Sequence, residues 1–460
     1  MSNQSAQRLK DLSEEVVVEA IHRYVSREFV KQQIENCGVQ EKKRKKLGSV
    51  LVVFFILYQC LFRDSNRREV LQKLVEGYRT RGWKIPQRAL ATRSALCKAL
   101  KRVGSKVLKK SYEAFALSQK PCEESFYHGM RLRAYDSSGF NCEDSAENRK
   151  TYGKPSSREG ECAWPQLKLV MEVDVGTRQP AKMAYGGYRS DEIQRVHQLL
   201  SEAQEGELYL LDRGLGCFKN MKKIQDRKAQ FLARLPKYRK VKPLTPLRDG
   251  SYWGEMRDEL RGETIRVRVI EFRIANPRRA HPREVQRLVT SLGDEGLYPG
   301  LELIELYHQR WEIEISFDEL KTHLFDRPRN ESFFRSQRSE GVLQELYGLL
   351  IIYSVIRCLM QEAAAKYDLD PRRLSFTACV QILRRAVVRM QAARSELLIG
   401  MYEDLLNEMA GSLLPQRENR INPRVVKKRR KKFPSKGKGH DQTKPLKTTF
   451  MQDVQIVAHA

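Results

Sequence analysis

Between residues 126 and 235 the sequence changes repeatedly from strand-like to helical segments. Five short segments are apolar or alternate apolar with polar residues, as strands do; they cover 130–135, 167–175, 181–185, 208–211 and 229–235. Two other segments, near 191–203 and 218–228, are expected to be helical. Strands that alternate with helices in this way predict an α/β fold.

The most distinctive combination of side chains lies further on, in residues 307–321. If this segment is one α-helix with about 100° per residue, four side chains project within an arc of about 60°: those of Tyr307, Arg310, Glu314 and Lys321. His308, Glu312 and Glu319 would point away from the apolar stripe beside them. A carboxylate flanked by two cations and a phenol suits the joint binding of a metal ion and a phosphate. A helix whose charges are only solvated is the alternative.

Two aspartates stand at the ends of predicted strands. Asp212 closes the apolar run Glu-Leu-Tyr-Leu-Leu and is followed by Arg-Gly, and Asp136 closes the segment 131–135. A strand terminus holds a carboxylate rigidly at the edge of a sheet. Aspartates in such places are also common turn formers, so position alone does not assign a function.

Together these residues resemble the insertion sequence family 4 of DDE transposases, whose signature is Tyr, two residues, Arg, three residues, Glu, six residues, Lys. The resemblance implies that Glu314 is the last acid of a catalytic triad. Asp212, in its apolar strand followed by Arg-Gly, resembles the family's second acid. A ribonuclease-H-like core is expected as well, since three strands, a helix, a strand and further helix is the order of that fold.

The first acid is implied by the order of residues 131–148. This stretch follows the family's strand, Asp-Gly and Asp-Thr-Pro-Glu-Asn order without a gap, which makes Asp136 the first acid. Ser137 stands where the family has glycine, so the local turn is expected to differ. An alignment of the Asp-Gly step on residues 128–129 would leave the triad incomplete. The alternatives for this acid are Asp144 and Asp174.

The first 118 residues are expected to be helical and basic, with helices near 14–35, 47–62, 66–78, 93–103 and 105–116. Residues 62–77 resemble the N-terminal domain of the same transposase family. Four cations on a candidate recognition helix would bind DNA: Arg93, Lys98, Lys101 and Arg102. A solvated basic face on a packing helix is the alternative.

Residues 235–291 alternate polar with apolar or β-branched residues, as antiparallel strands do, and resemble the β-rich insertion of the family. Arg266 and Arg268 would share one strand face and follow a DNA backbone, with Arg273 on the other face. A half-buried strand with an exposed basic face is the alternative. Helices at 340–367 and near 376–393 are expected in the core.

The predicted architecture is an α/β, ribonuclease-H-like catalytic core that a β-rich insertion interrupts, with a helical N-terminal domain and a basic C-terminal tail. Beyond residue 414 the tail, with its cationic run 426–433, is expected to be disordered when free and to bind phosphates without sequence preference. The expected parts are the DNA-binding domain 1–118, the first part of the core 119–234, the insertion 235–291, the second part of the core with the signature helix 292–395, and the C-terminal helix and tail 396–460.

Composition favours a nucleic-acid partner. Lys and Arg number 85 against 57 Asp and Glu, a formal charge of +28, which favours binding to a polyanion. The nine cysteines form no Cys-x-x-Cys pair and no Gly-x-x-x-x-Gly-Lys loop occurs, so structural zinc and nucleotide-driven chemistry have no support. The apolar run 50–62 is too short to span a bilayer, and no signal peptide is expected.

The resemblance implies a bacterial, cytoplasmic and nucleoid-associated enzyme that moves an insertion sequence by cut and paste. It would bind terminal inverted repeats and target DNA as a homodimer, form a hairpin intermediate and use no membrane. Asp136, Asp212 and Glu314 would hold two Mg²⁺ ions, for which Mn²⁺ could substitute, and Tyr307, Arg310 and Lys321 would contact DNA near the cleaved end. Two alternatives stay open: a transposase-derived DNA-binding protein without catalysis, and a junction or repair nuclease on the same fold.

Overall fold

In the computed structural model the described residues are 20–41, 47–80, 92–157, 160–162, 164–258, 262–277, 283–324, 333–415 and 447–457. The chain forms two compact units: the first unit, residues 1–199 with 311–413, and the second unit, residues 200–310 with 414–460. Helices and a mixed sheet are both present, which confirms the α/β class expected from the sequence. The five-part division of the chain stays a prediction.

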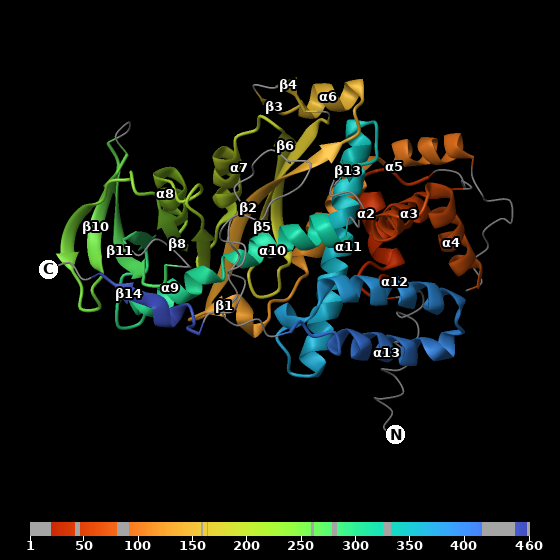
Figure 1. Ribbon diagram of the computed structural model, residues 1–460. Coiled ribbons are helices and arrows are strands. Elements are labelled where there is room, and N and C mark those ends of the chain that lie inside the picture. The colour runs from red at the N-terminus through yellow and green to blue at the C-terminus, as the bar shows by residue number, and fades with distance from the viewer. Residues whose placement is uncertain are drawn as a thin grey trace, which may run out of the picture. The chain divides into compact units, whose positions relative to one another are not determined.

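The first unit contains most of the helices. They are α2 (Arg27–Asn36), α3 (Ser49–Leu61), α4 (Arg67–Thr80), α5 (Arg93–Leu117), α6 (Ala146–Tyr152), α7 (Glu192–Leu199), α10 (Trp311–Asp318), α11 (Ser339–Lys366), α12 (Phe376–Ala392) and α13 (Leu398–Ala410), with the 3-10 helices η1 (Glu123–Ser125), η4 (Pro371–Arg373) and η5 (Ser395–Leu397). The helix α11 packs against α3, α5 and α13 (Figure 1). Of the described helices, α11 alone is long and apolar enough to cross a membrane, but 94% of its apolar window is buried within the protein. This burial confirms the core helix expected at 340–367.

A glycine divides α5 into the two helices that the sequence predicts. Gly104 has a φ of 67°, which other residues rarely adopt, and α5 is kinked there. Ser105 N donates to Glu340 Oε1 at 2.5 Å. The Gln344 side chain donates to the carbonyl oxygens of Leu100 and Gly104, each at 2.9 Å. Side chains of α11 therefore satisfy backbone groups that the kink leaves without helical partners.

The sheet of the first unit is built on one long strand, β2. Its strands are β1 (Phe126–Tyr127), β2 (Met130–Cys142), β5 (Gln166–Asp174), β6 (Pro180–Gly187) and β13 (Phe333–Phe334), while β3 (Ser156–Ser157) and β4 (Gly160–Glu161) form a separate pair. β5 is antiparallel to β2, β6 is antiparallel to β5, and β13 is parallel to β2. His128 and Gly129 both have positive φ and form the two-residue turn between β1 and β2. The glycine at 129 is thus explained by a hairpin turn.

The described part of the second unit contains a mixed sheet and two α-helices. Its elements are η2 (Leu200–Glu202), β7 (Glu207–Leu211), α8 (Phe218–Asp226), β8 (Gln230–Leu235), β9 (Lys242–Pro246), β10 (Tyr252–Arg257), β11 (Thr264–Ile274), β12 (Gln286–Thr290), α9 (Gly300–His308), η6 (Met451–Asp453) and β14 (Val454–Ile456). β7 and β8 are parallel, and β12, β11, β10 and β9 follow β8 in antiparallel order. The strands expected within residues 235–291 are present.

The prediction that Arg268 lies on an exposed basic face is wrong. Arg268 is fully buried, pairs with Asp249 and donates to Ser251 Oγ at 2.8 Å. Its neighbours on both sides in β11 are buried too, so the alternating pattern does not produce an exposed face here. Arg266 is exposed, with its guanidinium 4.2 Å from the centre of the Trp253 ring.

The expected tail is ordered at its far end. The strand β14 pairs antiparallel with β11, where Phe272 lies opposite Ile456 (Figure 1). The expectation of a disordered tail is therefore wrong for residues 454–456, because their backbone pairs with β11. The cationic run 426–433 and residues 14–19 of the first expected helix lie outside the described residues.

Candidate functional site

Asp136 lies in the middle of β2 instead of at a strand end. Both Asp136 and Ser137 pair with residues of β5, and the strand continues to Cys142. No turn occurs at Ser137. Its backbone is extended and paired with β5, a conformation that serine adopts as readily as glycine. Side chains alternate along a strand, so Asp136 and Ser138 project from the same face.

The two alternative first acids are engaged in structural interactions. The Asp174 carboxylate is buried and accepts hydrogen bonds at 2.6 to 3.0 Å from three residues, Ser125, Arg131 and Thr177. Asp144 forms ion pairs at 2.6 and 3.0 Å with Arg149 and Lys154. Hydrogen bonds from these two cations lower the pKa of Asp144 to about 2. Either acid would have to give up such contacts to bind a metal ion.

The signature segment is not one helix, so the angular prediction for it is wrong. The helix α9 ends before Gln309, α10 starts at Trp311, and a hydrogen-bonded turn separates them. After α10 the chain continues as a π-helix, η3 (Glu319–Leu324), whose wider turn changes the angle between successive side chains. The boundary between the two units falls between Arg310 and Trp311. Tyr307 and Arg310 thus belong to the second unit, and Glu314 and Lys321 belong to the first.

In the first unit, Lys321 contacts β2, the strand that carries the candidate first acid Asp136. Its Nζ donates to Ser138 Oγ at 2.9 Å and lies 5.3 Å from the centre of the Phe140 ring. Asp136 alternates with these two residues along one face of β2, so the ammonium group lies on the face from which Asp136 projects. The helix α10, which carries Glu314, packs against the same strand. The first unit thus combines an aspartate with the glutamate and lysine of the signature.

A buried ionic network that the sequence did not reveal fixes α10 and η3. Arg178 donates to Glu312 at 2.5 Å and to Glu319 at 2.8 Å. Glu319 also accepts from Tyr353 at 2.8 Å and pairs with Arg357 at 3.5 Å. Glu319, expected to face away from the core, is only 4% exposed because these groups surround it. No motif or periodicity marks Arg178, which lies in a turn between strands.

Nearby carboxylates keep the buried Arg178 guanidinium charged. Burial lowers the pKa of the Arg178 guanidinium, but the carboxylates of Glu319 and Glu312 outweigh burial and raise that pKa above its ordinary value. A buried cation held by two carboxylates fixes both of them in place. The network therefore positions the segment that carries Glu314 and Lys321.

In the second unit, Tyr307 contacts β7, the strand that ends directly before the candidate second acid Asp212. Its hydroxyl donates to Leu211 O at 3.1 Å, and Asp212 follows directly after the end of β7 as predicted. Asp212 Oδ1 accepts from Leu215 N at 2.7 Å, which fixes the turn after the strand. Burial raises the pKa of Tyr307 to about 12, although the positive charge of Arg310 opposes the rise. The hydroxyl is therefore a hydrogen-bond donor at neutral pH. The second unit thus combines Asp212 with the tyrosine and the buried arginine of the signature.

We expect Tyr307→Phe to lower the free energy of unfolding by about 1 kcal/mol, the net value of one hydrogen bond. Denaturant titration measures the change, with Tyr238→Phe as the control, because Tyr238 is exposed. Above the ordinary tyrosine pKa of about 10, the unfolded chain ionises first, so the stabilisation should fall as pH rises through 10 toward the folded pKa of about 12. Equal stability of Tyr307→Phe and wild type would contradict the described hydrogen bond.

The four cations predicted to bind DNA through α5 differ in their surroundings. Arg93, Lys98 and Lys101 are exposed. Arg102 forms an ion pair with Glu41 at 3.1 Å and donates a hydrogen bond to the backbone carbonyl of Leu47. Arg102 therefore has a structural role, and DNA contact by all four residues stays a prediction.

The three candidate acids are partly exposed carboxylates, the ligands that hard divalent ions prefer. Within the described ranges, no three Asp, Glu, His or Cys side chains lie close enough together to hold a metal ion. The structure packs α10, the helix of Glu314, against the strand of Asp136, which Lys321 also contacts, and it brings Tyr307 to the strand that precedes Asp212. The complete triad stays a prediction.

Models of known protein families match most of the chain. Residues 127–355 match the family described as Transposase DDE domain, and residues 7–113 match the family described as Insertion element 4 transposase N-terminal. Transposase InsG for insertion sequence element IS4 from Escherichia coli (strain K12) is 24% identical over 426 residues, with 90% of this chain and 92% of the relative covered. A solved structure, the piggyBac transposase synaptic complex with hairpin DNA, is 10% identical and covers 85% of this chain and 84% of its own, but a TM-score of 0.42 is too low to establish a shared fold. The two family matches together span most of the chain, in the order expected from the sequence, and the chain therefore belongs to the insertion sequence 4 family of DDE transposases.

Proposed function

We propose that this DDE transposase binds the ends of an insertion sequence and moves it by cut and paste, with Asp136, Asp212 and Glu314 as one catalytic site. The contacts of the signature segment carry the proposal. Tyr307 bonds to the backbone beside Asp212, and Lys321 bonds to β2 on the face of Asp136. Glu314 lies midway in the sequence, seven residues from each of these anchors. One continuous segment thus carries the glutamate and contacts both strands that carry the aspartates.

The proposed core is ribonuclease-H-like. Three antiparallel strands, β2, β5 and β6, are followed in the chain by α7 and then by the parallel strands β7 and β8. This is the order expected for such a core. The antiparallel strands β9 to β12 precede α9 in the chain, which fits an insertion before the signature segment.

DDE transposases depend on divalent metal ions, and we propose two Mg²⁺ ions because three carboxylates form a hard oxygen donor set. When bound, these ions polarise the attacked phosphodiester and favour deprotonation of the attacking water or DNA 3′-hydroxyl. The protein holds the carboxylates in place: Asp136 through paired backbone, Asp212 through Leu215 N, and Glu314 through the network around Glu319. Lys321 and Arg310 would offset phosphate charge near the cleaved end.

DNA is the partner of the transposase, and the formal charge of +28 supports binding to a polyanion. We further propose that a homodimer acts on the paired inverted repeats, forms a hairpin intermediate and inserts the element into target DNA. The proposed location is the bacterial cytoplasm, in association with the nucleoid. The family matches do not favour a DNA-binding protein without catalysis or a repair nuclease.

Cleavage of a DNA fragment that carries the element's own end tests the proposal. The full chain should cut the fragment at the element boundary in Mg²⁺. Cleavage should stop when EDTA removes the metal, because the carboxylates alone cannot activate the attacking group. A gel-shift assay should show that end binding persists in EDTA. Binding without cleavage in either Mg²⁺ or Mn²⁺ would support the inactive alternative, and cleavage without joining to target DNA would support the nuclease.

A further inference from the structure

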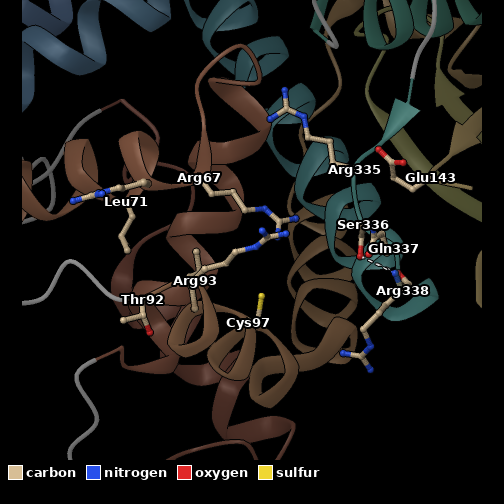
Figure 2. A pocket seen from close by; sticks show the side chains of 12 residues that line it. Arg67, Leu71, Thr92, Arg93, Cys97, Glu143, Arg335, Ser336, Gln337 and Arg338 are labelled. Carbon is tan, nitrogen blue, oxygen red and sulfur yellow. Dashed lines mark hydrogen bonds between the residues drawn. The ribbon is translucent and has the colours of Figure 1, made fainter. Parts of the chain in front are cut away.

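Five arginines line one cavity of the first unit, which we call the arginine pocket. Its volume is about 810 Å³, and it is bordered by α4, the start of α5 and the residues just before α11 (Figure 2). The arginines are Arg67, Arg68, Arg93, Arg335 and Arg338. Glu143 is the one acidic residue in the described lining. The pocket therefore has a strong excess of positive charge.

Carboxylates neutralise only part of this charge. Arg67, Arg68 and Arg93 form no ion pair with any residue in the described part of the chain. Figure 2 shows the side chains of Arg67 and Arg93 extending toward one another. Arg338 is 3.9 Å from Glu147, at the limit of an ion pair.

Burial and neighbouring cations lower the pKa of the Arg335 guanidinium. Burial lowers the pKa of the Arg335 guanidinium, and the positive charges of Arg63 and Arg67 lower it further, whereas Glu345 raises it. Glu345 also pairs with Arg63 at 3.7 Å, so one carboxylate serves two cations. An anion bound among these groups would relieve the repulsion.

Phosphate is the anion that this arrangement suits. The planar guanidinium group presents parallel N–H donors that match two phosphate oxygens at once, and charge-assisted bonds of this kind are stronger than neutral ones. The arginines come from α4, α5 and the segment before α11, so they can surround a ligand from several sides. A transposase meets such groups along the backbone of its DNA substrate.

We propose that the arginine pocket binds a backbone phosphate of the element-end DNA at a fixed distance from the cleaved bond, an inference that rests on the proposed function. The strand β2 sets this distance. β13 pairs with β2 so that Phe334 lies opposite Cys142. Arg335, which lines the pocket, is the residue after Phe334. Asp136 lies six residues before Cys142 in the same strand, a separation of about 20 Å at roughly 3.3 Å per residue. One strand of a duplex carries a phosphate every 3.4 Å or so along the duplex axis. With the duplex axis running along β2, as we propose, the pocket binds the backbone about six phosphates from the bond at Asp136.

Binding to chemically modified DNA tests this assignment. The full chain is titrated without divalent metal, by fluorescence anisotropy, with a duplex that carries the element's own terminal repeat. In a series of duplexes one phosphate at a time is replaced by an uncharged methylphosphonate. Replacement about six phosphates from the cleaved bond should weaken wild-type binding roughly tenfold, the effect of removing one charged hydrogen bond.

The double variant Arg67→Ala with Arg93→Ala should bind the unmodified duplex more weakly and should no longer respond to that methylphosphonate. The slope of log affinity against log salt should fall by about 0.9 for each phosphate that the variant no longer neutralises. Arg67→Gln with Arg93→Gln removes both charges but keeps polar side chains, and it should show the same absence of response if the alanine pair fails to fold. A full methylphosphonate response in either folded variant would overturn the proposal.

The matched control is Lys109→Ala with Lys110→Ala. It removes two cations from α5, the helix that also carries Arg93, at positions outside the pocket where both lysines pair with Glu113. The control should keep the methylphosphonate response. Inorganic phosphate that occupies the pocket without weakening duplex binding would assign the pocket to a free anion and reject the DNA contact. The binding assay contains no metal, so its result does not depend on catalysis. If the protein shows the methylphosphonate response but does not cleave DNA in the separate assay with Mg²⁺, the result counts against the catalytic proposal alone.

Discussion

Replacing Asp136, Asp212 or Glu314 with alanine should abolish metal-dependent cleavage of the element end. Each variant removes a charged ligand from the proposed metal site, and the loss of several kcal/mol of transition-state stabilisation corresponds to a rate decrease of about 10³-fold or more. Binding to the same DNA should stay close to wild type, because the phosphate contacts lie elsewhere. Cleavage and gel-shift assays on one DNA fragment measure both quantities.

Asp144→Ala is the matched control for Asp136→Ala. Asp144 belongs to the same stretch of sequence, but its carboxylate pairs with Arg149 and Lys154 near the surface. We expect Asp144→Ala to cleave DNA. The opposite pattern, with cleavage abolished in Asp144→Ala and retained in Asp136→Ala, would reverse the assignment of the first acid.

The second large effect concerns the network that positions the signature segment. Glu319→Gln should lower the free energy of unfolding by about 3–5 kcal/mol, because it leaves the buried guanidinium groups of Arg178 and Arg357 without their shared carboxylate. Cleavage should fall as well, since η3 also carries Lys321. Denaturant titration measures the stability, and the cleavage assay measures the activity.

An exposed ion pair provides the comparison for this variant. Glu403→Gln breaks the pair with Lys366 on the surface of the first unit, and surface pairs contribute little to stability. Its unfolding should be indistinguishable from wild type. If Glu319→Gln were also as stable as wild type, the buried network would not hold α10 and η3.

Local patterns in the sequence predicted the regular elements of this protein well. The strand expected at 167–175 is β5, at Gln166–Asp174, because its burial follows directly from a run of apolar residues. The helix break at Gly104 could be predicted because glycine readily adopts positive φ. Asp212 follows the end of β7 as expected, since an apolar strand that precedes Asp-Arg-Gly leaves few other interpretations.

Contacts between distant segments could not be predicted in the same way. Two residues of the π-helix η3 form hydrogen bonds with distant residues, Lys321 with Ser138 and Glu319 with Arg178, and neither pair is close in sequence. Arg268 looked like half of an exposed basic face, but the partner that buries it, Asp249, lies on another segment. The arginine pocket combines residues of 67–71 and 92–97 with Glu143 and 335–338, so no local motif marks it.

A change of metal preference tests the central claim most directly. A thiolate is a soft ligand that Mg²⁺ accepts poorly, whereas the transition metal Mn²⁺ accepts sulfur more readily. Cleavage of the element end is therefore measured in Mg²⁺ and in Mn²⁺ for Asp136→Cys, with Asp144→Cys as the control. The metal site predicts that Asp136→Cys is inactive in Mg²⁺ and regains cleavage in Mn²⁺, while Asp144→Cys cleaves in both. Equal cleavage by Asp136→Cys in the two metals, or restoration in neither, would contradict direct metal binding by Asp136.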